Sequence, residues 1–498
     1  MSEVTIHLHP AGKVLRVQRG IRLQDILFEH GVEFPCGGKG RCKGCRIRLL
    51  EGSLPIHSEE QERLSSEELE QGWRLACLGR VEADLTIELA QWEAKVLTDH
   101  SSFRFHPRPG AGVAIDLGTT TIAAQLVDLA TGNVLGVETA LNSQARHGAD
   151  IMSRVEYAVS QEGGELLCRL ARGQVGEMIG RLVRNAGIKA SLLSDVVVVG
   201  NTVMHHLFCD LNLEPLSHYP FEPTASGLHE FSVQSLGWDF SGNPTVRFLP
   251  CLGGFVGSDI LAGIVATGMN KSDKPCALMD LGTNGEIVVG TKERMLCAST
   301  AAGPAFEGAR ISAGMRAATG AISEVRVVNG ALECHALGNA LPRGICGSGL
   351  VDAAAAGREL NLILESGRFA GGDTLPLAGA VVLTQWDIRE LQMAKGAIAA
   401  GLKLLLSEFG IRPDDLSALY LAGAFGNYIN LASGVRIGLL GVEGSRIRPS
   451  GNTALLGAKM DLFNTGNGYW ELLRRVRHVS LNELDGFQDT YVEEMRFP

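Results

Sequence analysis

Several large classes of protein are excluded by what this sequence lacks. No run of apolar residues approaches the ~18 that a membrane-spanning helix needs, so no membrane span is predicted. Positive charge is not in excess: 45 Lys and Arg stand against 55 Asp and Glu, a formal charge of -10, which excludes a broad electrostatic surface for nucleic acid. The G-x-x-x-x-G-K-[ST] pattern is absent, so a P-loop nucleotide site is also excluded.

The eleven cysteines do not have the pattern of a secreted, disulfide-bonded protein. Their number is odd and their spacing is uneven. The opening residues, MSEVTIHLHP, alternate as a β-strand does and contain no apolar core of a signal peptide. We therefore expect a protein of the reducing cytoplasm.

The chain does have enough apolar sequence for several cores. Of its 498 residues, 45% are hydrophobic and 20% are charged, an ordinary globular composition. At roughly 150 residues per domain, this length predicts about three units. Glycine is in excess, with 62 residues and no collagen-like period, so we expect glycines in functional turns.

The pattern of apolar residues indicates where these units lie. Residues 1–93 combine short strand-like segments with a helix-like segment, which indicates a small α+β module. Residues 94–111 are polar and contain proline and glycine, as a flexible linker does. Beyond them, apolar strands such as 112–117 and 277–282 alternate with helix-length segments, which predicts an α/β architecture with buried sheets.

An internal repeat divides the larger part of the chain. The segments AIDLGTTTIAAQLVD and MDLGTNGEIVVG place Asp116 and Asp280 in matching positions, 164 residues apart. The repeat predicts two related halves, 112–270 and 271–498.

Four cysteines of the first module have the spacing of a metal cluster. Cys36, Cys42 and Cys45 lie in the loop PCGGKGRCKGC with spacing C-x5-C-x2-C, and Cys77 follows after 31 intervening residues. Three clustered thiolates and a distant fourth are the ligands of a ferredoxin 2Fe-2S cluster. A zinc site or a disulfide pair is the alternative, but zinc sites usually show two compact cysteine pairs.

The cysteine loop resembles that of the 2Fe-2S ferredoxins, although its x5 gap departs from the plant-type x4 spacing. The resemblance implies a β-grasp fold for residues 1–93. Five basic residues without an intervening acid either offset the charge of the cluster or dock a partner: Lys39, Arg41, Lys43, Arg46 and Arg48. The remaining cysteines have no ligand-like spacing and are expected to pack in apolar surroundings: Cys168, Cys209, Cys251, Cys276, Cys297, Cys334 and Cys346.

The repeated segments indicate a nucleotide site. Asp116 and Asp280 each end an apolar strand and are followed by a Gly-Thr turn, which can set a carboxylate beside Mg²⁺ and close amides and hydroxyls on phosphate oxygens. A third turn, LAGAFG, ends at Gly426 and would let a flat adenosine approach the backbone. Together the three pieces resemble the phosphate 1, phosphate 2 and adenosine motifs of the ATPase superfamily of actin, hexokinase and the heat-shock chaperones.

This resemblance implies a duplicated actin-like (ribonuclease H-like) ATPase fold that binds ATP and Mg²⁺. The expected catalytic residues are Asp116, Asp280 and Glu307. The expected nucleotide-binding residues are Gly118, Thr119, Thr120, Gly282, Thr283, Asn284, Gly303, Gly423, Ala424, Phe425 and Gly426.

Other polar residues have weaker signals. Asp150 and Arg154 are one helical turn apart, which favours a salt bridge on a solvated helix face. Asn201 reads as a helix start, with a role in the nucleotide cleft as the alternative.

Glycine-rich turns carry two acids and one helix start whose roles stay open. Asp259, like Glu307, either caps a surface turn or orients water or metal, and the Gly347-Ser-Gly turn either touches nucleotide or simply begins a helix. His205 and His206 are expected to pack within a helix or face solvent, because adjacent residues point to different faces.

The whole chain resembles one family that joins these two activities. The order of units and five segments are similar to the reductive activators of corrinoid proteins: NSQARHGADIMSRVEYA, VVVVGNTVMHHL, GPAFEGARISAGMRAATGAI, GICGSGLVDA and LAGAFGNYIN. The resemblance implies an ATP-hydrolysing, electron-transferring enzyme that returns the Co(II) corrinoid of a methyltransferase system to Co(I). It implies a corrinoid protein and an external low-potential electron donor as partners, and leaves a homodimer open.

Three other functions stay open at this point. The chain could activate another low-potential metalloenzyme, act as a redox-sensing ATPase switch, or phosphorylate a small molecule. A four-cysteine module separate from the ATPase halves argues against the first, and a sugar kinase has no need of an iron-sulfur cluster.

Overall fold

The computed structural model describes most of the chain. The residues it describes are 3–9, 13–27, 32, 40, 45–89, 103–148, 150–160, 163–282, 284–464 and 468–498. Cys36, Cys42 and Thr283 lie outside them.

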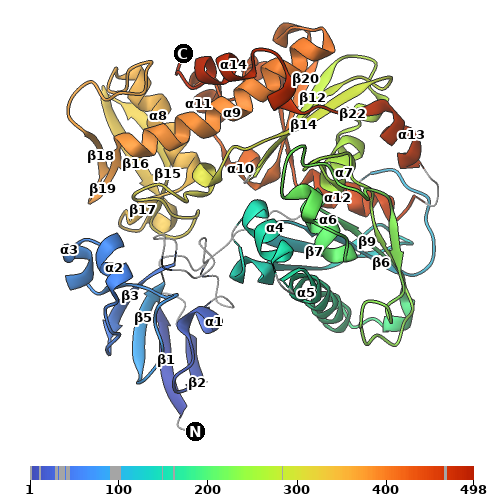
Figure 1. Ribbon diagram of the computed structural model, residues 1–498, viewed down its shortest axis with the longest axis horizontal. Coiled ribbons are helices and arrows are strands. Elements are labelled where there is room, and N and C mark those ends of the chain that lie inside the picture. The colour runs from blue at the N-terminus through green and yellow to red at the C-terminus, as the bar shows by residue number, and fades with distance from the viewer. Residues whose placement is uncertain are drawn as a thin grey trace.

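The N-terminal module is a five-stranded mixed sheet with short helices (Figure 1). The strand order is β2-β1-β5-β3-β4, with β1 and β5 parallel and the other pairs antiparallel, which is the predicted β-grasp arrangement. Its elements are β1 (Glu3–His9), β2 (Lys13–Gln18), α1 (Leu23–Leu27), β3 (Arg46–Glu51), α2 (Ser58–Arg63), α3 (Ser66–Glu70), β4 (Trp73–Leu75) and β5 (Leu85–Leu89).

The next part of the chain forms lobe I around a six-stranded sheet of order β10-β11-β9-β6-β7-β8. Burial along the central strand β6 is nearly continuous, because protein covers both of its faces, whereas exposure alternates along the edge strand β8. The elements of lobe I are β6 (Ala111–Leu117), β7 (Thr121–Asp128), β8 (Val134–Leu141), α4 (Ile151–Val159), α5 (Gly163–Asn185), β9 (Leu193–Val199), α6 (Thr202–Cys209), β10 (His229–Phe231), β11 (Thr245–Phe248) and α7 (Ser258–Thr267).

Lobe II repeats the same topology in a sheet of order β21-β20-β12-β13-β14-β22. In lobe I, β6, β7 and β8 pair antiparallel, β9 pairs parallel to β6, and β11 pairs parallel to β9. In lobe II, β12, β13 and β14 pair antiparallel, β20 pairs parallel to β12, and β21 pairs parallel to β20. This correspondence confirms the two related halves predicted from the repeat. The strands of the main sheet are β12 (Cys276–Leu281), β13 (Gly285–Gly290), β14 (Met295–Thr300), β20 (Ala418–Ala422), β21 (Ile447–Gly451) and β22 (Val476–His478).

Lobe II also contains two small sheets and the helices α8 to α14. The small sheets contain β15 (Ala321–Val328), β16 (Ala331–Ala336), β17 (Gly344–Ile345), β18 (Thr374–Ala378) and β19 (Val381–Thr384). The helices are α8 (Gly347–Glu359), α9 (Gln385–Phe409), α10 (Gly423–Tyr428), α11 (Leu431–Arg436), α12 (Thr453–Asp461), α13 (Gly468–Arg475) and α14 (Phe487–Glu494).

Helices α7 and α12 join the lobes between their sheets (Figure 1). They cross so closely that a Cβ built on Gly457 would lie 2.2 Å from the carbonyl oxygen of Ala262. One hydrophobic core collects Ala114 from lobe I, Leu278 from lobe II and Leu455 from α12. This shared core makes the pair of helices a packed connection between the lobes.

The N-terminal module contacts both lobes. Leu141 and Ala145 of lobe I pack against the hydrophobic core of the module. Glu88 of β5 forms an ion pair with Arg343 of lobe II, in which Glu88 Oε1 and Arg343 Nη1 are 3.1 Å apart. Both side chains are about one quarter exposed. The module therefore bridges the two lobes.

The described part of the predicted linker is packed against lobe I and α12. The Phe105 ring lies 4.4 Å from that of Phe463, and Arg108 pairs with Asp195 at 2.7 Å. The second half of the linker is thus fixed to the lobes, contrary to the expectation of flexibility over 94–111.

Burial of the cysteines in the two lobes agrees with the prediction for all but one. Cys334 is half-buried in β16, and the other six are buried.

Within the residues described, no helix combines the length and apolar character needed to cross a bilayer.

Candidate functional site

A single pocket of about 330 Å³ lies between the lobes, at the ends of the repeated strands. Asp116 comes from β6 and Asp280 from β12, so the two repeats present their carboxylates to the same space. Most of the residues predicted to bind nucleotide line it: Gly118, Thr119, Thr120, Gly282, Asn284, Gly423 and Phe425. Glu307, which was predicted to be catalytic, lines it as well.

The structure does not bring every predicted residue to this pocket. Gly303 precedes the 3-10 helix Pro304–Glu307, and Gly426 packs toward Leu421; neither is among the lining residues. Ala424 lies in the short helix α10, and Thr283 lies outside the described residues.

Desolvation raises the pKa of four carboxyl groups in the pocket. Enclosure between the lobes raises the pKa of Asp116 to about 6 and, together with the nearby Asp116, that of Asp280 to about 7. Desolvation and the nearby Asp280 raise the pKa of Asp259 to about 8, and desolvation raises that of Glu286 well above its usual range. Acids arranged this way favour a cation among them, and the oxygen donor set fits Mg²⁺.

Two of these acids extend the sequence prediction. Asp259, whose role the sequence left open, lies in the first turn of α7 and faces the pocket. Glu286 was missed, yet it interrupts the apolar strand β13 at the position where the first repeat has Ile122. An acid in the middle of a buried strand was the available signal.

Arg154 corrects the sequence prediction of an exposed salt bridge. Its side chain is fully buried, and its Nη2 donates to the carbonyl oxygen of Thr119. Thr119 belongs to the turn after Asp116, which we call the first phosphate loop. The Arg154 Nε donates to the carbonyl oxygen of Gly148 at 2.9 Å. Asp150 instead caps α4 by accepting from the backbone N–H of Ser153 at 2.8 Å. The arginine therefore fixes the loop rather than a solvated helix face.

Asn201 caps a helix, as predicted, and also lies in the pocket. Its side-chain oxygen caps α6 by accepting from Met204 N–H at 3.0 Å, and its Nδ2 donates to the Thr119 hydroxyl at 2.8 Å. It also lines the pocket. The cap thus ties α6 to the phosphate loop.

The third glycine turn, which begins at Gly423, lies against Asp280 and Leu281 at the start of the second repeated turn, which we call the second phosphate loop. Gly423 has φ +82°, and a Cβ at this position would lie 2.4 Å from Asp280 Oδ1, so only glycine fits there. After it, the Phe425 ring stacks on Phe306 with centroids 4.5 Å apart, and both rings line the pocket. They provide the flat apolar surface that a purine base needs.

Two further groups complete the pocket from lobe II. The Gly347-Ser-Gly turn begins α8, as predicted, and both Gly347 and Ser348 line the pocket. Arg316, which the sequence did not single out, also lines it, and burial lowers its pKa to about 10, so it stays cationic at neutral pH. A guanidinium beside helix N–H groups suits a phosphate chain.

The described cysteines of the N-terminal module lie at one end of its sheet. Strands β3 and β4 pair with Arg46 opposite Leu75, and the N–H of Ala76 donates to the carbonyl oxygen of Cys45 at 3.1 Å. The ladder thereby brings Cys45 and Cys77 to the same end of the strands. Cys45 is buried and Cys77 half-buried, which suits ligands of a cluster shielded from water.

The basic residues beside this site are partly neutralised. Arg46 pairs with Glu68 at 3.2 Å and lies over the Trp73 ring, and Arg48 pairs with Glu88 at 3.9 Å. These two arginines therefore do not add free positive charge to a docking surface.

Comparisons with known proteins cover nearly the whole chain. Family models match the 2Fe-2S iron-sulfur cluster binding domain at residues 6–82, the RACo middle region at 111–272 and the C-terminal ASKHA domain of RACo at 274–498. Corrinoid activation enzyme RamQ of Eubacterium limosum is 36% identical over 78% of this chain and 71% of its own.

Two further relatives have similar names. The [Co(II) methylated amine-specific corrinoid protein] reductase of Methanosarcina barkeri is 27% identical over 69% of this chain and 68% of its own. A solved structure of a reductive activator for a corrinoid, iron-sulfur protein superposes with a TM-score of 0.70 at 27% identity, covering 100% of this chain and 98% of that one.

Proposed function

This chain belongs to the reductive activators of corrinoid proteins, and from that membership we propose that it uses ATP to return the Co(II) corrinoid of a methyltransferase system to Co(I). The observation that carries the proposal is the union, in one chain, of a four-cysteine β-grasp module with a duplicated, acid-lined nucleotide cleft. A simple electron carrier has no use for such a cleft.

The cysteine module has the residues to hold the redox group. Cys36, Cys42, Cys45 and Cys77 would bind a 2Fe-2S cluster, which supplies one-electron transfer when present. Backbone pairing of β3 with β4 holds two of these thiols at one end of the sheet, and the buried Cys45 limits access of water.

The cleft has the residues to bind ATP as substrate. Asp116 and Asp280 would hold Mg²⁺, with Asp259 and Glu286 beside them. The first phosphate loop and Arg316 bind the phosphates, and Phe306 and Phe425 accept the base. Glu307 lines the same pocket and is the candidate to orient the attacking water.

The energetic need for ATP follows from the reduction. A one-electron step about 300 mV uphill costs roughly 7 kcal/mol, since 59 mV corresponds to about 1.4 kcal/mol. ATP is of the right order to drive it. The nucleotide can act only through different affinities for the open and closed cleft, so the lobes must move on binding.

The wider assignments of this proposal are as follows. Residues 1–93 form the electron-transfer module, 94–111 the connection, and 112–270 and 271–498 the ATPase halves; the matched family ranges support this division. A corrinoid protein is the partner, and an external low-potential donor reduces the module. A cytoplasmic location and a homodimer stay predictions.

Anaerobic spectroscopy of a Co(II) corrinoid protein mixed with this protein tests the proposal. We expect the Co(I) spectrum only when both ATP and a low-potential reductant are present. Reduction that is independent of ATP would refute it. ATP consumption only with a sugar or carboxylate acceptor would identify a kinase instead, and nucleotide-dependent partner binding without electron transfer would identify a switch.

A further inference from the structure

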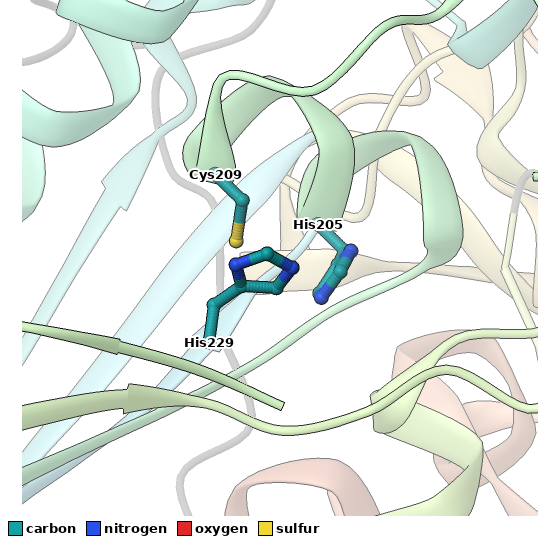
Figure 2. Close-up of side chains that lie close together, drawn as sticks. All are labelled: His205, Cys209 and His229. Carbon is teal, nitrogen blue, oxygen red and sulfur yellow. The ribbon is translucent and has the colours of Figure 1, made fainter. Parts of the chain in front are cut away.

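A second cluster of metal-ligating side chains lies in lobe I, away from the nucleotide pocket. His205 and Cys209 are four residues apart on α6 and therefore share one face of the helix. His229, the first residue of β10, lies opposite them. One potential ligand atom from each of the three lies within 4.8 Å of the other two, and Figure 2 shows the three side chains gathered together.

Burial of these groups is not matched by hydrogen bonds. His205 is fully buried, Cys209 is 7% exposed, and His229 is half-buried. His205 Nε2 lies 3.1 Å from the carbonyl oxygen of Gly227, but its Nδ1 has no partner. Within the described part of the chain, no hydrogen bond reaches the Cys209 thiol or the His229 ring. Polar groups that are buried together without partners call for an explanation such as an ion.

A metal ion would bind these three groups as neutral imidazoles and a thiolate. Binding would therefore displace the proton of the Cys209 thiol and give the unpartnered Nδ1 of His205 a partner.

We propose that His205, Cys209 and His229 bind a zinc ion. Imidazole nitrogen and thiolate sulfur are both ligands that Zn²⁺ takes in proteins, whereas Mg²⁺ and Ca²⁺ take oxygen ligands. In a tetrahedral zinc site the ligand atoms are about 3.5 Å apart. The ligand atoms, which lie within 4.8 Å of one another, would move to that spacing on binding, and the fourth position is left to water or a nearby carbonyl oxygen.

The ion would fix a part of lobe I that has little regular structure. Residues 210–228 connect α6 to the edge strand β10 with only one short 3-10 helix, and the metal joins the two ends of this connection. The other end of α6 is capped by Asn201, whose amide donates to Thr119 in the phosphate loop. The site is therefore structural and stabilises the helix that supports the loop; it does not depend on the function proposed above.

Metal analysis of the full-length protein tests this site. After growth with zinc and dialysis against a weak chelator, we expect about one zinc per chain in addition to the cluster iron. Cys209→Ser and His229→Gln should each lower bound zinc at least tenfold and leave the iron content unchanged, and a far-ultraviolet circular dichroism spectrum like that of the wild type shows that these variants fold. Cys334→Ser, which removes a half-buried thiol elsewhere, should retain zinc.

X-ray absorption at the zinc edge separates this site from the cysteine module. We expect one sulfur and at least two nitrogen ligands. An all-sulfur shell would place the zinc on the module cysteines and overturn the proposal. So would zinc-free wild-type protein, or equal zinc in the wild type and both variants.

Discussion

Arg154 is a buried cation whose main partner is a backbone carbonyl in the phosphate loop. With Arg154→Gln, the Thr119 carbonyl loses its donor and the loop loses a fixed position. We expect the KM for ATP to rise roughly tenfold, equivalent to about 1.4 kcal/mol, with the visible cluster spectrum retained. Steady-state ATPase measurements check this.

Arg169→Gln is the matched control, because Arg169 is exposed on α5 and pairs with Glu165 on the same helix. It should leave KM unchanged. An unaltered KM in the Arg154 variant would contradict a positioning role for that residue.

The pocket acids predict how stability varies with pH. Their folded-state pKa values of about 6 for Asp116, 7 for Asp280 and 8 for Asp259 exceed the unfolded value of about 3.9. A raised acid pKa contributes stability below the unfolded value, and this contribution is lost as pH rises through the folded value. Without nucleotide, the thermal midpoint should therefore fall by several degrees between pH 6 and pH 8.

Mg-ATP should raise the thermal midpoint more at pH 8 than at pH 6, because fewer protons must then be displaced. Asp259→Asn should reduce the pH dependence, and scanning fluorimetry measures all of these values. A midpoint that rises between pH 6 and pH 8 without nucleotide would show that these carboxyls are not desolvated.

At the residue scale, the sequence predicted the acidic residues at the ends of the repeated strands. It missed or misassigned the residues of other segments that contact the same pocket or its loops. Asp116 and Asp280 were identifiable because a repeat marks them. Arg154 was misassigned, because the spacing to Asp150 shows one helix face but not what covers it. Glu286 was detectable only as an acid within an apolar strand.

Helices α7 and α12 allow a test of packing at the scale of an element. Gly457→Ala would drive a methyl group into the backbone of Ala262, which cannot rotate away. Overpacking of this kind costs about 1–3 kcal/mol, so we expect the thermal midpoint to fall by roughly 3–10 °C, together with ATPase activity.

Gly173→Ala is the matched helical substitution. Gly173 lies in α5 with nothing near its missing Cβ, so alanine should leave the midpoint unchanged or raise it slightly. Equal midpoints in the two variants would contradict close packing of α7 on α12.

Elements were predictable where a local signal exists. The apolar segment 112–117 became the main part of β6, whereas the start of α9 at Gln385 was not predicted. The missed signal was the capping box of Thr384 with Asp387. The close crossing of α7 and α12 could not be predicted, because the residues in contact are far apart in the sequence and follow no shared pattern.

At the scale of the molecule, the two activities should be separable by mutation. Asp280→Ala should abolish ATP turnover without changing the cluster spectrum, because the carboxylate lies in the cleft and not in the module. Cys77→Ser should stop corrinoid reduction and spare ATP binding. Turnover that persists in the first variant, or reduction in the second, would reject the corresponding role.

Docking of the module can be tested through its ion pair with lobe II. Arg343→Glu would oppose Glu88 with a like charge, so we expect the module to separate and the radius of gyration in X-ray scattering to increase. The exchange Glu88→Arg with Arg343→Glu should restore compactness. Arg326→Glu is the control, since Arg326 pairs with Glu324 on its own strand. No change in the Arg343 variant would mean that the pair does not hold the module.

The sequence carried the fold class and the family because motifs identify whole units. It could not predict how those units touch. Glu88 and Arg343 have no spacing or periodicity that relates them, and Leu141 gives no sign that it packs on another unit. Such contacts depend on surfaces that exist only after each unit has folded.

The bridging position of the module has a thermodynamic consequence. Leu141 pairs with Thr121, beside the first phosphate loop, and Arg343 lies just before the Gly347 turn that lines the pocket. If closing the cleft changes the separation of these two contacts, nucleotide binding and docking of the module share a coupling free energy. Coupling is reciprocal, so release of the module must alter the affinity for ATP by the same factor by which ATP alters its release.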